Sequence, residues 1–157
     1  MSLEHIDSAT DLFREFLKSK DLKITRQREI LLRRIFEREE HFSAETLEDR
    51  VKGDGISKAT IYRTLQLLVE AKLISEVALV DDRRMYEHTY GHDPHDHIVC
   101  VDCNKVFEFD AATLADLEAK IVSALRFVPV GHRLRIEAAC EVLRETGKCT
   151  RKEIKLI

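Results

Sequence analysis

The residues best suited to chemistry in this sequence lie in one short stretch, His95 to Cys103. It carries two imidazoles, on His95 and His97, and two thiols, on Cys100 and Cys103, together with carboxylates. In an extended segment alternate side chains share a face, so His95 and His97 point one way and Asp96 the other. The C-x-x-C spacing lets a turn bring both sulfurs onto one metal ion. The stretch therefore predicts metal binding, with a harder nitrogen and oxygen environment beside a soft thiolate one.

Other uses of these residues are a redox C-x-x-C or a solvated polar loop. A thioredoxin-type oxidoreductase places its C-x-x-C at the start of a helix after a strand, whereas this one ends a predicted strand and enters a hairpin. A metal-dependent hydrolase is the alternative from another class, and it needs an open coordination position beside a substrate pocket. The sequence offers no separate nucleophile or general base, so we expect that the chain is not an enzyme.

Length and composition limit the class of protein. The 157 residues have room for one ordinary domain or two small ones, and 44% hydrophobic with 35% charged residues is typical of soluble globular proteins. The sequence has neither a long apolar run nor a signal peptide, so we expect a cytoplasmic protein with no membrane partner. In a reducing compartment four cysteines favour metal ligation over disulfides. The net charge of −3 means that any DNA binding needs a local basic face.

The first half of the chain reads as helices. Apolar spacing predicts a helix over 4–20, and Thr25, Ser43 and Ser57 are predicted N-caps of three more. The helix after Ser57 has an apolar stripe at Ile61, Leu65 and Leu68, and its exposed early face carries Lys58, Ala59, Tyr62, Arg63 and Gln66. Two helices joined by a Gly-containing turn describe a helix-turn-helix that can enter a major groove. A plain three-helix bundle with a solvated face is the alternative.

A β-hairpin is predicted directly after the last of these helices. Ser75–Val80 and 85–89 read as strands around a polar turn at 81–84. A hairpin at this place makes a winged helix, with Arg83 and Arg84 at the wing tip where phosphates would be reached. Alternatively the two arginines only keep an exposed turn polar.

Gly91 and Pro94 indicate a boundary, which predicts a domain over 1–90, a hinge near 88–94 and a second domain over 95–157. In the second domain Val106–Phe109 is expected to pair back on the strand after the histidines, which would place Glu108 across from them. A helix starting after Asp110, with apolar residues at spacings of three and four, and a strand within 133–140 complete a β-β-α-β unit. The expected fold class is α+β, and a second domain this small needs a metal or a partner subunit for stability.

Several motifs occur in order along nearly the whole chain: Leu22-Lys23-Ile24-Thr25-x-x-Arg28, His41-Phe42-Ser43-Ala44-Glu45, Ala59-Thr60-Ile61-Tyr62-Arg63-Thr64-Leu65, His95–Cys103 and Phe107-Glu108-Phe109. Together they resemble the ferric uptake regulator (Fur) family of metal-sensing bacterial repressors. The resemblance implies an N-terminal winged-helix DNA-binding domain joined by a hinge to a C-terminal α/β dimerisation domain. It also implies a homodimer that binds double-stranded DNA at an A/T-rich palindromic operator.

The resemblance implies a regulatory metal site at the hinge, made by His41, Glu87, His95, His97 and Glu108. Mixed imidazole and carboxylate ligands suit Fe²⁺ or Mn²⁺ and also Zn²⁺, so the ligand types alone do not name the metal. His41 and Glu87 belong to the first domain and the other three to the second. One ion bound by all five would hold the two domains in one relative orientation.

Two further metal sites are implied. A structural Zn²⁺ site is matched by Cys100 and Cys103, while Cys140 and Cys149 are separated by eight intervening residues where family members have a closer pair. We expect a Cys₄ zinc site, and the rival reading is that Cys149 is a free thiol. A third site, matched by Asp96 and His132 alone, is expected to be weak or absent, because Pro94 and Ala115 replace the histidine and glutamate that the family usually has.

The DNA contacts implied by the resemblance are Tyr62 and Arg63 on the recognition helix, with Lys23 and Arg28 near the backbone or the minor groove. Tyrosine against thymine methyls suits A·T-rich sequence read partly through shape. The implied function is Fe²⁺-responsive repression of metal-uptake genes. A zinc- or manganese-responsive regulator is an alternative, as is a peroxide sensor, although that branch usually has aspartate in place of Glu108.

Overall fold

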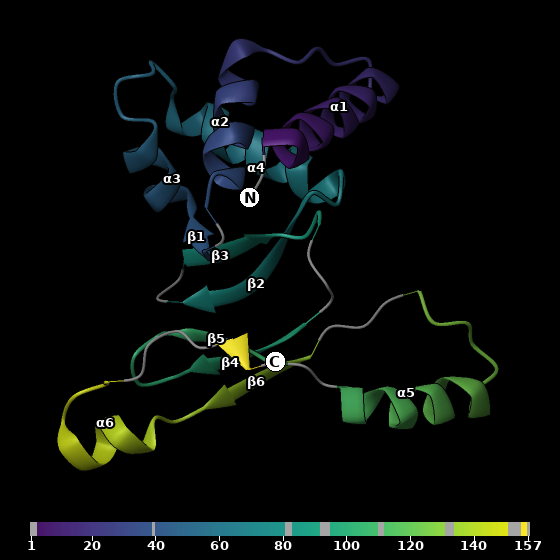
Figure 1. Ribbon diagram of the computed structural model, residues 1–157, viewed down its shortest axis with the longest axis vertical. Helices are drawn as coiled ribbons and strands as arrows, with labels where there is room; N and C mark the ends of the chain where they lie inside the picture. The colour runs from purple at the N-terminus through teal and green to yellow at the C-terminus, as the bar shows by residue number, and fades with distance from the viewer. Residues whose placement is uncertain are drawn as a thin grey trace. The chain divides into compact units, whose positions relative to one another are not determined.

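The computed structural model describes residues 3–38, 40–80, 83–91, 95–109, 112–130, 134–150 and 155–156. The chain divides into two compact units, Met1–Asp93 and Pro94–Ile157, and each unit has a β-sheet of its own (Figure 1). Helices combine with small sheets, so the expected α+β fold class is confirmed. Among the described residues, none of the helices has the length and apolarity needed to cross a membrane.

In the described part of the first unit, four helices make up most of the chain: α1 (Leu3–Ser19), α2 (Arg26–Phe36), α3 (Ala44–Arg50) and α4 (Lys58–Glu70). All three predicted N-caps are confirmed, because the hydroxyls of Thr25, Ser43 and Ser57 accept from the backbone N–H three residues later. Each such cap is worth about 1 kcal/mol. The starts of α2, α3 and α4 are therefore set by local sequence.

The core of the first unit lies between these helices. Its fully buried large side chains include the predicted apolar stripe of α4, and four residues of α2: Ile61, Leu65, Leu68, Leu31, Leu32, Ile35 and Phe36. Truncating one such side chain to alanine typically costs about 2–5 kcal/mol. Because Ile61 and Leu65 face inward, the opposite face of α4 is left on the surface, and Tyr62 and Arg63 are exposed there.

An antiparallel sheet completes the first unit, with strand order β1 (Phe42–Ser43), β3 (Arg83–His88), β2 (Ile74–Val80). The predicted hairpin is confirmed, but its turn was set too wide. Arg83 and Arg84 belong to β3, opposite Val80 and Leu79, and the guanidinium of Arg84 lies 3.1 Å from the Glu76 carboxylate. Asp81 and Asp82 lie outside the described residues. The two-residue strand β1 was not predicted, because two residues carry no alternation signal.

Within its described residues, the second unit has a four-stranded sheet and two helices. Its strands are β4 (Asp96–Cys100), β5 (Val106–Phe109), β6 (Arg135–Ala138) and β7 (Lys155–Leu156), in the order β6-β4-β5-β7. The predicted β4–β5 hairpin is antiparallel, and β6 and β7 run parallel to β4 and β5. The helices are α5 (Ala112–Ala124) and α6 (Glu141–Thr146). Both α6 and β7 are too short to leave a periodic pattern, and the β-β-α-β expectation missed them.

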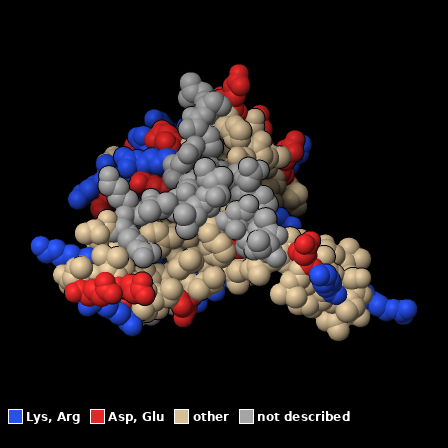
Figure 2. All heavy atoms as spheres, turned by 60° about the horizontal axis from the view of Figure 1, so that its bottom comes forward, with Lys and Arg blue, Asp and Glu red and all other residues tan. Residues whose placement is uncertain are grey.

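The helix α5 presents its apolar stripe to the outside of the single chain. Leu114, Leu117, Ile121 and Leu125 are between 40% and 64% exposed. In Figure 2 the lobe at the right is mostly uncharged on the face in view, with a few acidic and basic side chains. The helical spacing was predicted correctly, but the stripe packs on no core within its own unit. A contiguous apolar face of this kind marks an interaction surface.

Candidate functional site

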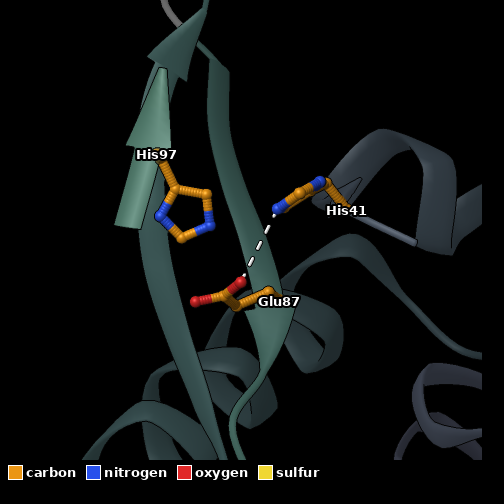
Figure 3. A group of neighbouring side chains, drawn as sticks. All are labelled: His41, Glu87 and His97. Carbon is orange, nitrogen blue, oxygen red and sulfur yellow. Dashed lines mark ion pairs between the residues drawn. The ribbon is translucent and has the colours of Figure 1, made fainter. Parts of the chain in front are cut away.

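In the first unit the structure brings together His41 and Glu87. His41 directly precedes β1, and the pairing of Phe42 with Tyr86 sets it beside the end of β3 that carries Glu87. His41 Nε2 lies 3.6 Å from Glu87 Oε2, with side chains only 8% and 14% exposed. Figure 3 shows the imidazole and the carboxylate directed toward one another, with the ion pair dashed. This pair is one nitrogen and one oxygen donor in a largely buried setting.

The orientation of the Glu87 carboxylate is held by a neighbouring strand. Ser75 on β2 lies opposite Glu87, and its hydroxyl donates to Glu87 Oε1 at 2.9 Å. The other oxygen, Oε2, is the one nearer to His41. Loss of a hydrogen bond that orients a metal-ligating side chain typically lowers metal affinity about 10–100-fold.

In the second unit the structure brings together His95, His97 and Glu108. The register of β4 and β5 sets His97 directly opposite Glu108, as the sequence predicted. His95 lies two residues before His97, and its Nε2 is 3.8 Å from Glu108 Oε2. The two imidazole rings meet edge to face, with centroids 4.9 Å apart, and His97 is buried. The set supplies two nitrogen donors and one carboxylate.

Each unit therefore carries a partial ligand set of the same chemical kind. Imidazole with carboxylate suits divalent Fe, Mn and Zn ions. The first unit offers two of the predicted donors and the second offers three. Two or three protein donors leave positions open on an ion that prefers five or six ligands.

The thiols of the second unit form another cluster. Cys140 and Cys149 flank α6, and their sulfurs are 4.0 Å apart. The thiol of Cys103 interacts with those of both Cys100 and Cys149, and all four cysteines are free of disulfides. Tetrahedral zinc with Zn–S bonds of about 2.3 Å requires sulfurs about 3.8 Å apart. The eight-residue spacing between the last two cysteines is thus closed by α6 to a distance that fits one ion.

The two thiols of the C-x-x-C turn differ in acidity. Partial burial raises the pKa of Cys103 to about 11, and the thiols of Cys100 and Cys149 act in the same direction. Burial also opposes ionisation of Cys100, but the backbone N–H groups of Asp102 and Cys103 outweigh it and lower the pKa of Cys100. Binding of a metal to this cluster must therefore release protons.

Asp96 was predicted as part of a weak third metal site. It is buried, and its Oδ1 accepts the backbone N–H of Leu134 at 2.9 Å, just before β6. This bond ties β4 to the chain entering β6. The second predicted member, His132, lies outside the described residues, as does Pro94. The third site stays a prediction.

The exposed face of α4 carries the side chains predicted to contact DNA. Tyr62 is 50% exposed, and its hydroxyl donates to Glu45 of α3 at 3.3 Å. The nearby carboxylate raises the pKa of Tyr62, so the phenol stays neutral. Lys58 Nζ lies 3.1 Å from Glu48, also on α3. Arg63 is exposed on the same helix.

Lys23 and Arg28, predicted near the DNA backbone or minor groove, lie around the start of α2. Lys23 is exposed, whereas Arg28 is half-buried and donates from Nη1 to the Lys23 carbonyl at 2.6 Å. Arg28 therefore shapes the backbone that presents Lys23. The guanidinium charge of Arg28 therefore lies close to the surface that carries Lys23.

Three residues with a part in these sites were not singled out from the sequence. Ser75 orients Glu87, Glu45 contacts Tyr62, and Asp102 accepts hydrogen bonds from the backbone of Cys140 and from Arg144. The predicted turn at 81–84 sets Glu87 opposite Ala78, so the pairing of Ser75 with Glu87 could not be read from that register. The contacts of Asp102 and Glu45 join segments far apart in sequence, so no local sequence pattern predicts them.

Comparison with known proteins gives a consistent result. Residues 19–137 match the family model described as Ferric uptake regulator family. The ferric uptake regulation protein of Bacillus subtilis (strain 168) is 33% identical over 154 residues, covering 94% of this chain and 99% of that protein. The protein of the same name from Campylobacter jejuni is 29% identical, covering 99% of each chain.

Solved structures agree with the fold. The ferric uptake regulator of Francisella tularensis with iron has a TM-score of 0.68 at 28% identity, covering 78% of this chain and 95% of that one. The regulator of Pseudomonas aeruginosa with manganese has a TM-score of 0.69 at 28% identity, covering 80% and 95%. A Helicobacter pylori structure, at 24% identity, shares the fold with a TM-score of 0.78 and covers 91% and 96%.

Proposed function

We propose that this chain, which belongs to the ferric uptake regulator family, is an Fe²⁺-responsive repressor of metal-uptake genes in the cytoplasm. Family members are metal-responsive transcriptional regulators, and this assigns the chain to gene regulation rather than to catalysis. The names of the curated relatives favour iron for this chain as well. Beyond family membership, we propose the identity of the metal, Fe²⁺, and of the regulated genes, those of metal uptake.

The observation that carries the proposal is the pair of incomplete ligand sets. His41 with Glu87 belongs to the first unit, and His95, His97 and Glu108 belong to the second. Neither set completes the coordination of a divalent ion, and the two use the same donor types. We assign all five side chains to one regulatory ion. When bound, the ion supplies positive charge that the two carboxylates and three neutral imidazoles share.

Such an ion gives the chain a switch. The five donors separate at the chain segment that the sequence predicted as a hinge, near 88–94, so an ion held by all of them favours one arrangement of the units over others. Shifting a two-state equilibrium from 1:99 to 99:1 requires about 5.5 kcal/mol of differential binding. A multidentate site whose ligands come from both units is a source of that difference.

DNA is the proposed readout of the switch. The first unit is a DNA-binding domain whose helix α4 enters the major groove, with Tyr62 and Arg63 against base edges and phosphate and with Lys23 and Arg28 beside the backbone. The second unit is a dimerisation domain, and the apolar stripe of α5 supports this because it lies exposed on a single chain. A symmetric dimer reads a palindromic site, here an A/T-rich one.

The four cysteines are assigned to a structural zinc ion. The 4.0 Å separation of the Cys140 and Cys149 sulfurs and the contacts of Cys103 with Cys100 and Cys149 support a Cys₄ site. Zinc bound there would add folding free energy to a unit with a small core. No part of the switch passes through it.

The proposal is tested by anaerobic titration of the zinc-loaded protein with Fe²⁺, Mn²⁺ or Zn²⁺ against a labelled A/T-rich palindromic duplex and a scrambled duplex. We expect Fe²⁺ to raise affinity for the palindrome alone. His97→Ala should remove the response, while Glu137→Gln, which changes an exposed carboxylate outside both ligand sets, should keep it.

Each other outcome has a definite meaning. Binding that is equal without added metal contradicts a metal switch. A response to Mn²⁺ or Zn²⁺ at concentrations where Fe²⁺ gives none assigns the chain to the manganese or zinc regulators, since the same donors serve those ions. Release from DNA on addition of peroxide to the Fe²⁺ form assigns it to the peroxide sensors.

A further inference from the structure

Asp102, inside the C-x-x-C turn, joins two parts of the second unit that are far apart in sequence. Its Oδ2 accepts the backbone N–H of Cys140, 38 residues along the chain, at 2.7 Å. The same carboxylate receives two bonds from Arg144, 42 residues along, with Nε to Oδ2 at 2.9 Å and Nη2 to Oδ1 at 3.0 Å. A bidentate arginine–carboxylate pair fixes the relative orientation of the two side chains as well as their separation.

The bonds fall at the start of α6, the helix between the last two cysteines. Cys140 is the N-cap of α6, but its own side chain makes no capping hydrogen bond, and Asp102 accepts from the cap residue instead. A helix of six residues has too few internal hydrogen bonds to be stable by itself. Its order must therefore come from contacts such as the pair between Asp102 and Arg144.

The far end of α6 is also defined. Gly147 has φ +71°, in the left-handed region that favours glycine, and its N–H bonds to the Leu143 carbonyl. This turn sends the chain back so that the sulfurs of Cys149 and Cys140 are 4.0 Å apart. The spacing of the second cysteine pair thus depends on α6 being formed and held in place.

We propose that Asp102 and Arg144 are positioning residues that clamp α6 to the C-x-x-C turn and so hold Cys140 and Cys149 in place to share a metal ion with Cys100 and Cys103. This rests on the proposed structural zinc site and deepens it. A closely spaced pair of cysteines can bind one ion because the turn between them brings their sulfurs together. The more widely spaced pair of this chain, Cys140 and Cys149, is brought together by α6. Asp102, which lies between the first two cysteines, holds this helix in place.

The test measures zinc retention and thiolate ligation in the full chain. Arg144→Ala is the main variant, because Arg144 is 61% exposed and its truncation leaves no buried cavity. Arg135→Ala is the matched control, since it removes an arginine from another surface pair of the same unit, with Glu137. The rate of zinc transfer to a chelator gives the first readout. Loss of an outer partner of a metal ligand typically weakens binding about 10–100-fold, so Arg144→Ala should release zinc correspondingly faster than Arg135→Ala.

Cobalt substitution gives the second readout. Sulfur-to-cobalt charge-transfer absorption arises from thiolate ligands alone, so ions at imidazole and carboxylate sites do not contribute. Arg144→Ala should lower this absorption per bound ion, and Arg144→Lys should restore part of it through a single remaining contact. Asp102→Asn keeps an oxygen for the Cys140 N–H. Its charge-transfer absorption per bound ion should lie between those of the wild type and Asp102→Ala.

Two failures are distinguishable. If Cys149→Ser leaves the wild-type cobalt spectrum unchanged, the Cys₄ assignment is wrong and the clamp is overturned with it. If Cys149→Ser alters the spectrum but Arg144→Ala and Asp102→Ala behave like Arg135→Ala in both readouts, the zinc assignment stands and the clamp alone is wrong.

Discussion

The hydroxyl of Tyr62 on α4 donates a hydrogen bond to Glu45 on α3 at 3.3 Å. The bond holds an exposed aromatic side chain of the recognition helix and also sets a carboxylate beside the surface proposed to meet DNA. Ser43 lowers the pKa of Glu45 through a side-chain hydrogen bond, with the backbone and Tyr62 contributing, so the group is ionised at neutral pH. A negative charge at this place repels phosphates of any sequence.

Glu45→Gln is accordingly expected to strengthen binding to random duplex several-fold, because it removes the repulsion and keeps an oxygen for Tyr62. The ratio of specific to random affinity should fall. Fluorescence anisotropy over a salt series measures both quantities. Glu137→Gln, on the second unit, serves as the charge-matched control, and equal random binding by the two variants would contradict the prediction.

Tyr62→Ala and Lys23→Ala separate base reading from phosphate contact. A side chain at a base edge carries about 1–3 kcal/mol of discrimination, so Tyr62→Ala should weaken the palindrome and leave random DNA nearly unchanged. Lys23→Ala should weaken both and lower the salt slope by about 1. An equal loss on both duplexes for the tyrosine variant would remove it from the reading surface.

Ser75→Ala is predicted to weaken the regulatory metal about tenfold, because Glu87 loses the hydroxyl that orients its carboxylate. The metal concentration that gives half-maximal DNA binding measures this shift. Metal-free behaviour should stay the same. Ser8→Ala, which removes an exposed hydroxyl bonded to a backbone carbonyl of α1, is the control. A response identical to that of Ser8→Ala would rule out an orienting role.

Asp96→Asn and Asp96→Ala distinguish a structural role of Asp96 from a metal-binding one. Asparagine keeps an oxygen for the Leu134 N–H, so its stability to urea should be close to wild type. Alanine leaves that part-buried donor without this acceptor, at a cost of up to about 1–3 kcal/mol. If instead both variants lose a bound metal ion and are equally stable, Asp96 acts chiefly as a ligand.

Leu117→Lys is expected to dissociate the homodimer, because it sets a charge in the centre of the exposed apolar stripe of α5. Sedimentation velocity across a concentration series measures the change. Asp116→Lys introduces the same side chain on the other side of the same helix and should leave the dimer intact. A Leu117→Lys protein that sediments like the control would place the dimer contact elsewhere.

The first unit was largely predictable from local signals. Thr25, Ser43 and Ser57 each begin a helix through a hydroxyl that reaches the backbone only three residues away. The wing was placed correctly except for its turn, because Arg83 and Arg84 look like turn residues by polarity yet continue the pairing of β3 with β2. Polarity is a weak guide where the side chains of a strand face water, as those of Arg83 and Arg84 do.

The second unit was less predictable because more of it depends on distant contacts. The stripe of α5 has the pattern of a core helix, and no pattern distinguishes burial within the chain from burial against another copy. The N-terminus of α6 has no side-chain cap of its own, and Asp102 from a distant part of the chain accepts the N–H of its cap residue instead. Such pairings are set by the path of the whole chain.

The sequence carries the residue types: imidazoles and carboxylates suited to a divalent ion, four thiols suited to zinc, and a tyrosine and an arginine on a capped helix. Which of these groups lie close together depends on the fold. Glu108 faces His97 because β4 and β5 pair in one register, and a shift by one residue would turn it to the other face. Cys149 reaches Cys140 because α6 folds between them. Residue types are local facts, whereas distances between side chains depend on register and on contacts made across the chain.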